Sequence, residues 1–71
     1  MNNVIKLREE FIKLGQALKA SGLADSGVDA KILISEGNIK VNGQTELRRG
    51  RKLYGGDIIE YNGDTVSIED W

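Results

Sequence analysis

The chain has 71 residues, of which 39% are hydrophobic and 30% charged, and its formal net charge is −1. This length leaves room for one domain, expected over residues 1–71, whose core would typically supply only ~3–5 kcal/mol. Cysteine and histidine are both absent, which excludes disulfides, the usual zinc ligands and the commonest catalytic base, so no metal or other cofactor is predicted. There is no apolar run long enough for a signal peptide or a membrane span, which predicts a cytoplasmic protein with no membrane partner.

The first predicted elements are a short edge strand over residues 4–7 and a helix over residues 10–20. Apolar residues of this helix recur at spacings of three and four; they are Phe11, Leu14 and Leu18. Gly15 lies beside this stripe, where a glycine costs ~1 kcal/mol of helix stability relative to alanine. We therefore expect another backbone segment to approach the helix closely at Gly15. Gly22 is suited to end the helix in a left-handed conformation.

A second helix is predicted to begin at Asp25 or Ser26, since either side chain can cap the free amides of the first turn. It runs to about Glu36, and Gly37 stops it. Two apolar stripes indicate that this helix is buried on more than one side; they consist of Val28, Ala30, Ile32, Leu33 and Ile34. Lys31 is left as a conspicuous outward group.

Alternating patterns after the second helix predict two β-hairpins. The first covers residues 39–47 and turns at Asn42-Gly43, and the second covers residues 58–68 and turns at Asn62-Gly63. Asn-Gly favours a type I′ turn because both residues readily adopt positive φ angles. With the edge strand, the hairpins would form a small twisted antiparallel sheet packed on the two helices, which is an α+β fold.

The cations are concentrated in one part of the chain. Residues 40–52 contain five cations and one acid, Glu46, whereas residues 57–71 contain five acids and no cation. Such a cluster is typical of a site for a polyanion such as RNA, and the amides at the start of the second helix would add donors for phosphate. Lys31 could reach the same side. The alternative is a solvated run of charges on a loop.

Two features within and beside this cluster have more than one interpretation. Arg49 and Arg51 would point to the same side if their segment is a strand, because alternate residues of a strand share a face. Tyr54, just past the cations, could stack on a nucleic-acid base. Packing in the core or against a neighbouring strand is the favoured interpretation for this tyrosine.

Catalytic residues are hard to place in this chain. None of the 11 carboxylates belongs to a spaced pair inside an apolar segment, where burial would raise a pKa usefully. Gly50, Gly55 and Gly56 do not form a phosphate loop, because the Lys-Ser/Thr that closes such a motif is missing. The chain is therefore predicted not to be an enzyme.

Several motifs together resemble the S-four-like RNA-binding domain, whose core is called the alpha-L motif. They are Leu14-Gly15-Gln16-Ala17-Leu18-Lys19, Ser26-Gly27-Val28-Asp29-Ala30-Lys31, Val41-Asn42-Gly43, Arg48-Arg49-Gly50-Arg51-Lys52-Leu53 and Gly56-Asp57. The order of these motifs is similar to that in a small stand-alone bacterial branch known by the names YaaA and YbcJ. The resemblance covers residues 11–61.

The resemblance implies two helices leading into a hairpin, with a shared face that contacts structured ribosomal or transfer RNA. A role in ribosome assembly or translation is expected, with a ribosomal subunit as a partner, and the protein itself is expected to be a monomer. The implied RNA contacts are Lys13, Ser26, Gly27, Lys31, Lys40, Asn42, Arg48, Arg49, Arg51 and Lys52. Lys19 is outside these positions. The family usually has Arg-Leu-Asp where this chain has Lys13-Leu14-Gly15, and often arginine where it has Gly27, which leaves more of the binding to residues 48–52.

Two other functions are alternatives to RNA binding. A protein-interaction adaptor would use the basic loop on an acidic partner, and nothing in the sequence excludes it. A ubiquitin-like sulfur carrier has a similar length, but its chemistry uses a C-terminal Gly-Gly, whereas this sequence ends in Glu-Asp-Trp.

Overall fold

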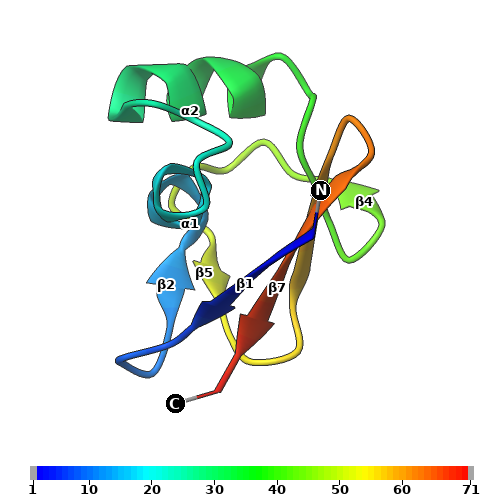
Figure 1. Ribbon diagram of the computed structural model, residues 1–71. Helices are drawn as coiled ribbons and strands as arrows, with labels where there is room; N and C mark the ends of the chain where they lie inside the picture. The colour runs from blue at the N-terminus through cyan, green and yellow to red at the C-terminus, as the bar shows by residue number, and fades with distance from the viewer. Residues whose placement is uncertain (1, 71) are drawn as a thin grey trace.

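The computed structural model describes residues 2–70, so Met1 and Trp71 of the predicted domain lie outside the described residues. These described residues form two helices, a five-stranded sheet and a separate two-stranded ribbon (Figure 1). In spatial order the sheet contains β1 (Asn2–Lys6), β7 (Asp64–Glu69), β6 (Ile58–Tyr61), β3 (Lys40–Val41) and β4 (Gln44–Thr45). The ribbon pairs β2 (Ile12–Lys13) with β5 (Lys52–Leu53).

The α+β class is confirmed, but the sheet is mixed where an antiparallel one was predicted. The β3–β4, β3–β6 and β6–β7 pairs are antiparallel, whereas β1 runs parallel to β7 from Asn2 beside Thr65 to Lys6 beside Glu69. A hairpin turn forces its two strands to be antiparallel. No such turn joins β1 to β7, because almost the whole chain lies between them, and the sheet can accept β1 in either direction.

Both hairpin turns were predicted correctly. Asn42 and Gly43 have φ angles of 53° and 84°, and Asn62 and Gly63 have φ angles of 50° and 86°. Positive φ at both central positions is what a type I′ turn requires. The turns fix the registers of β3 with β4 and of β6 with β7.

Helix α1 (Leu14–Ala20) is shorter than the predicted helix over residues 10–20. Residues 12–13 are extended and pair with β5. Backbone carbonyls of residues 48–51 then accept hydrogen bonds from the first amides of the helix. The Leu14 amide donates to the Arg51 carbonyl at 2.8 Å, and the Gly15 amide donates to the Arg49 carbonyl at 3.1 Å. Phe11 matched the helical spacing but lies outside the helix, because tertiary pairing overrides local propensity here.

Helix α2 (Gly27–Ser35) begins and ends as predicted. The Ser26 Oγ accepts a hydrogen bond from the Asp29 amide at 3.2 Å, and Gly37 follows the helix with a φ angle of +79°. The prediction that α2 is buried on more than one side is wrong, because Val28 is 67% exposed and Ile32 46% exposed. One face of α2 packs on α1, and the opposite face remains in solvent (Figure 1).

The core is one cluster to which both helices, the sheet and the ribbon contribute. Its largest fully buried side chains are Leu14, Leu18, Ile34, Ile39, Leu53, Ile59, Val41 and Val66. Leu53 joins the ribbon to this core, so the position of the ribbon relative to α1 is fixed by packing as well as by backbone hydrogen bonds. This arrangement holds the loop that follows β4 against the helices.

Candidate nucleic-acid interface

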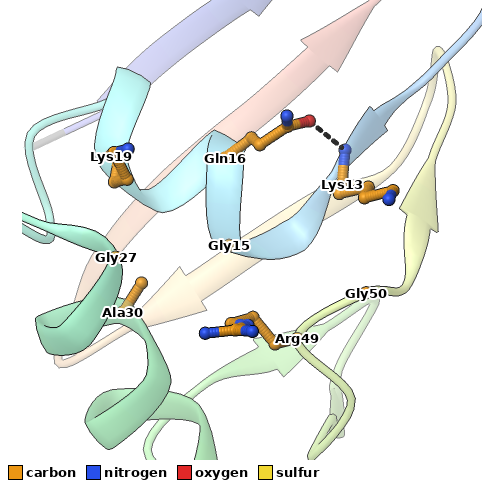
Figure 2. A pocket seen from close by; sticks show the side chains of 8 residues that line it. All are labelled: Lys13, Gly15, Gln16, Lys19, Gly27, Ala30, Arg49 and Gly50. Atoms are coloured by element: carbon orange, nitrogen blue, oxygen red, sulfur yellow. Dashed lines mark hydrogen bonds between the residues drawn. The ribbon is translucent and has the colours of Figure 1, made fainter.

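A depression of about 300 Å³ lies where α1, the start of α2 and the loop at residues 49–50 meet (Figure 2). Its lining residues are Lys13, Gly15, Gln16, Lys19, Gly27, Ala30, Arg49 and Gly50. Three of these residues are cationic and none is acidic. We call this the basic depression. Three positive charges without a matching acid create a local positive potential in a chain whose net charge is −1.

Gly15 brings Arg49 into the basic depression. A Cβ atom built on Gly15 would lie 2.7 Å from the Arg49 Cγ and 3.3 Å from its Cδ. Only a glycine therefore allows the arginine stem to lie across this turn of α1. The expected close backbone approach is confirmed, since the Gly15 amide bonds the Arg49 carbonyl at 3.1 Å. Figure 2 shows the Arg49 guanidinium extending into the space between α1 and α2.

The start of α2 forms another wall of the basic depression. Ser26 caps the helix through its hydroxyl, and Gly27 lines the depression with no side chain in the way. Lys31 is exposed and stands four positions after Gly27, so it shares that face of the helix. The positive end of the helix dipole adds to the charge of the lysine and arginine side chains.

Five residues that line the basic depression are not among the ten predicted RNA contacts, and the two of them with polar side chains are Gln16 and Lys19. Lys19 was placed outside the contact positions, yet it lines the depression together with Gln16. The Gln16 side chain accepts a hydrogen bond from the Lys13 amide at 3.3 Å, which steadies the start of α1 (Figure 2). The signal was present in the sequence, because Gly15 and Lys19 are four residues apart and share one helix face.

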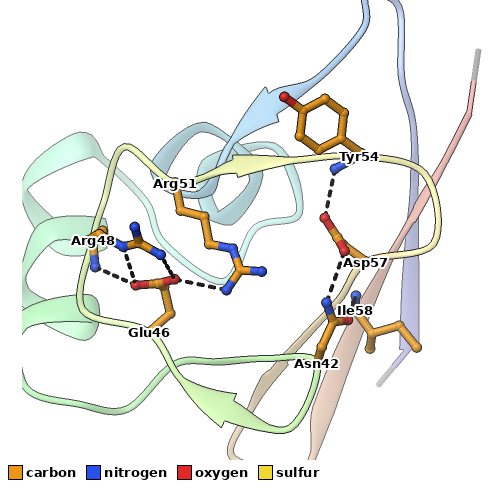
Figure 3. A network of polar contacts seen from close by, with 7 residues as sticks. All are labelled: Asn42, Glu46, Arg48, Arg51, Tyr54, Asp57 and Ile58. Atoms are coloured by element: carbon orange, nitrogen blue, oxygen red, sulfur yellow. Dashed lines mark hydrogen bonds and ion pairs between the residues drawn. The ribbon is translucent and has the colours of Figure 1, made fainter.

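Arg48 and Arg51 have a different environment from Arg49 (Figure 3). Both bind Glu46, a carboxylate that is only 6% exposed. Arg48 donates through Nε to Oε2 and through Nη2 to Oε1, each at 3.1 Å, and Arg51 donates through Nη1 to Oε1 at 2.9 Å. The Arg48 backbone amide also donates to Oε2 at 3.1 Å. We call these three residues the Glu46 cluster.

The electrostatics of the Glu46 cluster follow from these contacts. Hydrogen bonds from Arg48 lower the pKa of Glu46 to about 2, although burial of the carboxyl acts in the opposite direction. The same carboxylate raises the pKa of Arg48. Glu46 is therefore ionised and satisfied, and it neutralises part of the charge that made the segment look like a binding site in the sequence.

The loop between β4 and β5 is not a strand at the arginines. Arg49 and Gly50 form a turn, closed by a 3.3 Å hydrogen bond from the Arg51 amide to the Arg48 carbonyl. Arg49 therefore points into the basic depression, whereas Arg51 points to Glu46. Arg49 and Arg51 were expected to point to the same side only if their segment is a strand. Because the segment is a turn, they point to different sides.

Asn42 and Asp57 connect two of the sequence motifs (Figure 3). The Asn42 Nδ2 donates to the Asp57 Oδ1 at 2.9 Å, and its Oδ1 accepts from the Ile58 amide at 2.9 Å. The Asp57 Oδ2 accepts from the Tyr54 amide at 2.8 Å. The Val-Asn-Gly and Gly-Asp motifs thus form one network that ties the β3–β4 turn to the loop before β6. This gives Asn42 a structural role that sequence reasoning did not assign.

The remaining predicted contacts lie around the basic depression or apart from it. Of the ten predicted RNA contacts, those that line the depression are Lys13, Gly27 and Arg49. Lys52 is beside Lys13 in the ribbon register, whereas Lys40 is on the sheet between Thr45 and Glu60. The structure therefore brings three of the ten predicted contacts together in the depression, turns Arg48 and Arg51 to Glu46, and leaves Lys40 beside Glu60 on the sheet.

The described residues were also compared with the requirements for a membrane-spanning helix and for a metal site. Between residues 2 and 70, neither helix has the length and apolar character needed to cross a bilayer. No group of three or more Asp, Glu, His or Cys side chains in this range could hold a metal ion.

A sequence model of the S4 domain matches residues 5–69, so the chain belongs to the S4 domain family. This confirms the resemblance to the S-four-like domain. A Bacillus subtilis relative named as probable ribosome maturation protein RlbA is 46% identical over 63 residues, which cover 89% of each chain. YbcJ of Escherichia coli is 37% identical over 61 residues, which cover 86% of this chain and 87% of YbcJ.

Solved structures share the same fold. The solution structure of Escherichia coli YbcJ, described as revealing an alpha-L motif involved in RNA binding, matches with a TM-score of 0.68 and 31% identity. The match covers 96% of this chain and 85% of YbcJ. The 30S ribosomal protein S4e of Thermoplasma acidophilum also gives a TM-score of 0.68, at 24% identity over 82% of this chain and 31% of S4e. At that identity, S4e shows a common fold alone.

Proposed function

We propose that this protein binds structured RNA, with ribosomal RNA as the first candidate, and acts in ribosome assembly or maturation. The observation that carries the proposal is the basic depression, in which Lys13, Lys19 and Arg49 converge while none of the lining residues is acidic. The names of two relatives support it, since one is a probable ribosome maturation protein and the other has an alpha-L motif described as involved in RNA binding.

The geometry of the basic depression suits a phosphate backbone. The guanidinium of Arg49 can donate two parallel hydrogen bonds to phosphate oxygens, and the two lysines add less directional charge. Gly15, Gly27 and Gly50 line the depression without side chains, so a sugar–phosphate chain can approach the protein backbone. A volume of about 300 Å³ lies at the lower limit of the volumes typical of small-molecule pockets.

The proposal includes the remaining sequence predictions in a revised form. The primary contacts are Lys13, Lys19, Gly27 and Arg49, with Lys31 and Lys52 at the margin of the site. Ser26 acts by capping α2. Arg48 and Arg51 contribute less than their charge suggests because Glu46 binds both. We further propose that the domain over residues 1–71 works as a monomer in the cytoplasm, and as a binding protein, not an enzyme.

Ribosomal RNA transcripts of each subunit provide the test, with affinity measured by filter binding over a range of salt concentrations. Contact with about four phosphates, at about 0.7–0.9 each, predicts a log–log salt slope of about −2.8 to −3.6. The Lys6→Gln variant is the control, because Lys6 is exposed on β1 beside Glu69 and does not line the basic depression. A slope near zero, or an equal loss of affinity in Lys6→Gln and Lys13→Gln, would contradict the proposal. An adaptor that uses its basic loop on an acidic protein predicts equal, weak affinity for ribosomal transcripts and for an unrelated RNA of the same length.

A further inference from the structure

The outer face of the β2–β5 ribbon combines aromatic and cationic side chains. Ile12 pairs with Leu53 and Lys13 with Lys52 in an antiparallel register. Because alternate residues of a strand share a face, the side opposite the buried Leu53 is the outer one. The outer face carries Phe11, Lys13, Lys52 and Tyr54. We call this the ribbon face.

The two rings of the ribbon face contact each other across the strands. The Phe11 and Tyr54 centroids are 6.1 Å apart and the rings are tilted by 53°. The cross-strand contact that was favoured for Tyr54 is therefore present, but Tyr54 is not packed in the core, since it is 44% exposed. Figure 3 shows its ring directed away from the Asp57 carboxylate that binds the Tyr54 amide.

One cation of the ribbon face lies directly against the Phe11 ring. The Lys52 Nζ lies 4.8 Å from the centroid of the Phe11 ring, so this lysine covers Phe11 and leaves Tyr54 as the exposed ring. Lys13 and Lys52 are direct cross-strand partners. Like charges in such positions repel each other, and an anion between them removes the repulsion.

The ribbon face is continuous with the basic depression, because Lys13 belongs to both. We propose that Tyr54 stacks an unpaired base of an RNA whose neighbouring phosphates lie along Lys13, Lys52 and the basic depression. Nucleic-acid-binding surfaces commonly combine a positively charged track with aromatic rings on which successive bases stack. This inference rests on the proposed RNA binding and adds that the protein recognises a junction between structured RNA and an unpaired nucleotide.

The contribution of base stacking to RNA affinity can be measured separately from the contribution of charge. RNA hairpins would carry a short single-stranded extension at the 5′ or the 3′ end, made either of normal nucleotides or of abasic nucleotides with the same phosphates. Normal extensions should bind about fivefold to 100-fold more tightly than abasic ones, the range expected for base–aromatic stacking. Blunt hairpins measure the contribution of the basic depression alone.

Tyr54→Leu tests the ring while keeping an apolar contact with Phe11. We expect this variant to lose the preference for normal over abasic extensions and to bind the blunt hairpin like the original protein. Tyr54→Phe keeps the ring and should keep the preference. Leu47→Ala is the matched control, because Leu47 is an exposed apolar residue of the loop that precedes the arginines.

Results that overturn base stacking by Tyr54 can be distinguished from results that overturn RNA binding itself. If Tyr54→Leu keeps the preference for normal extensions, or if the original protein shows no such preference while it binds blunt hairpins, Tyr54 is a purely structural residue and the inference is overturned. If the original protein binds none of these RNAs at low salt, the proposed function fails and takes the inference with it. Thermal melting of each variant checks that the fold is retained.

Discussion

The basic depression and the Glu46 cluster receive arginines from the same short loop, yet they offer very different charge to a ligand. Arg49 enters a depression whose lining contains two lysines and no acid. Arg48 and Arg51, one and two residues away, are bound to one buried carboxylate. The difference shows that cations close together in a sequence need not be equally available. In this loop one buried acid decides which arginine is free.

The Glu46 cluster has a structural role in the loop that carries Arg49. By binding Arg48 on one side and Arg51 on the other, Glu46 fixes the ends of the turn that presents Arg49. Arg48 is exposed and an arginine has five donors, so it keeps some capacity to bind phosphate. We expect its contribution to be smaller than that of Arg49, since much of its charge is matched by Glu46.

The largest effect is expected from Arg49→Ala. Hydrogen bonds to charged groups contribute about 1.5–3 kcal/mol, so affinity for ribosomal RNA should fall about 10- to 100-fold. Arg48→Ala removes the same charge from the adjacent position and should cost several-fold less. Filter binding of the two variants to one transcript makes the comparison. Equal losses would show that the Glu46 cluster does not restrain Arg48.

Gly15→Ala should act on RNA binding through Arg49. The added Cβ would lie 2.7 Å from the Arg49 Cγ, so the arginine stem must leave the turn of α1. We expect affinity to fall by about tenfold, within the range for one charge-assisted contact. Stability should change little, because alanine adds about 1 kcal/mol of helix propensity that offsets the clash. A variant with full RNA affinity would mean that the position of Arg49 is unimportant.

Lys19→Glu and Lys31→Glu compare a residue that lines the basic depression with one that does not. Because Lys19 lines the basic depression, its charge reversal should cost at least as much affinity as Lys31→Glu, about several-fold at low salt. The motif resemblance alone predicts the reverse order, since it includes Lys31 and omits Lys19. Competition binding with both variants decides between the two orders. Neither change should affect the melting temperature much, because both side chains are exposed.

Glu46→Gln tests the Glu46 cluster through the stability of the fold and its dependence on pH. The folded pKa of about 2 lies below the ordinary value of 4.5, so the unfolded chain binds more protons between these values. The contribution of Glu46 is therefore complete above about pH 4.5 and disappears as pH falls to about 2. Thermal melting should show the original protein more stable than Glu46→Gln near neutral pH, with the difference shrinking through this range. A constant difference would show that Glu46 is not held ionised by the arginines.

Local chemistry explains which parts of the fold could be predicted from the sequence. Asn42-Gly43 and Asn62-Gly63 determine their turns through backbone preference, and Ser26 caps α2 with its own hydroxyl. These features depend on residues next to one another. The close approach at Gly15 was also predictable, because a glycine inside an amphipathic helix needs a packing reason.

Features that depend on distant partners were the ones that sequence reasoning missed. The extension of residues 12–13 depends on pairing with β5, nearly forty positions away, and the helical spacing of Phe11 concealed it. The role of Glu46 depends on a turn that brings Arg51 back to it. A single acid among five cations was visible in the sequence, and it is the signal that could have suggested an internal ion pair.

The central claim is that the free cations of the basic depression, not the total charge of the loop, bind RNA. Two charge-matched variants test it directly: Lys13→Gln/Arg49→Gln and Arg48→Gln/Arg51→Gln each remove two positive charges. The measurement is the log–log salt slope of binding to one ribosomal RNA transcript, at a temperature where both variants are folded. The first variant should lose about 1.4–1.8 units of slope, at about 0.7–0.9 per phosphate contact, and the second should lose clearly less. Equal losses in the two variants would contradict the account.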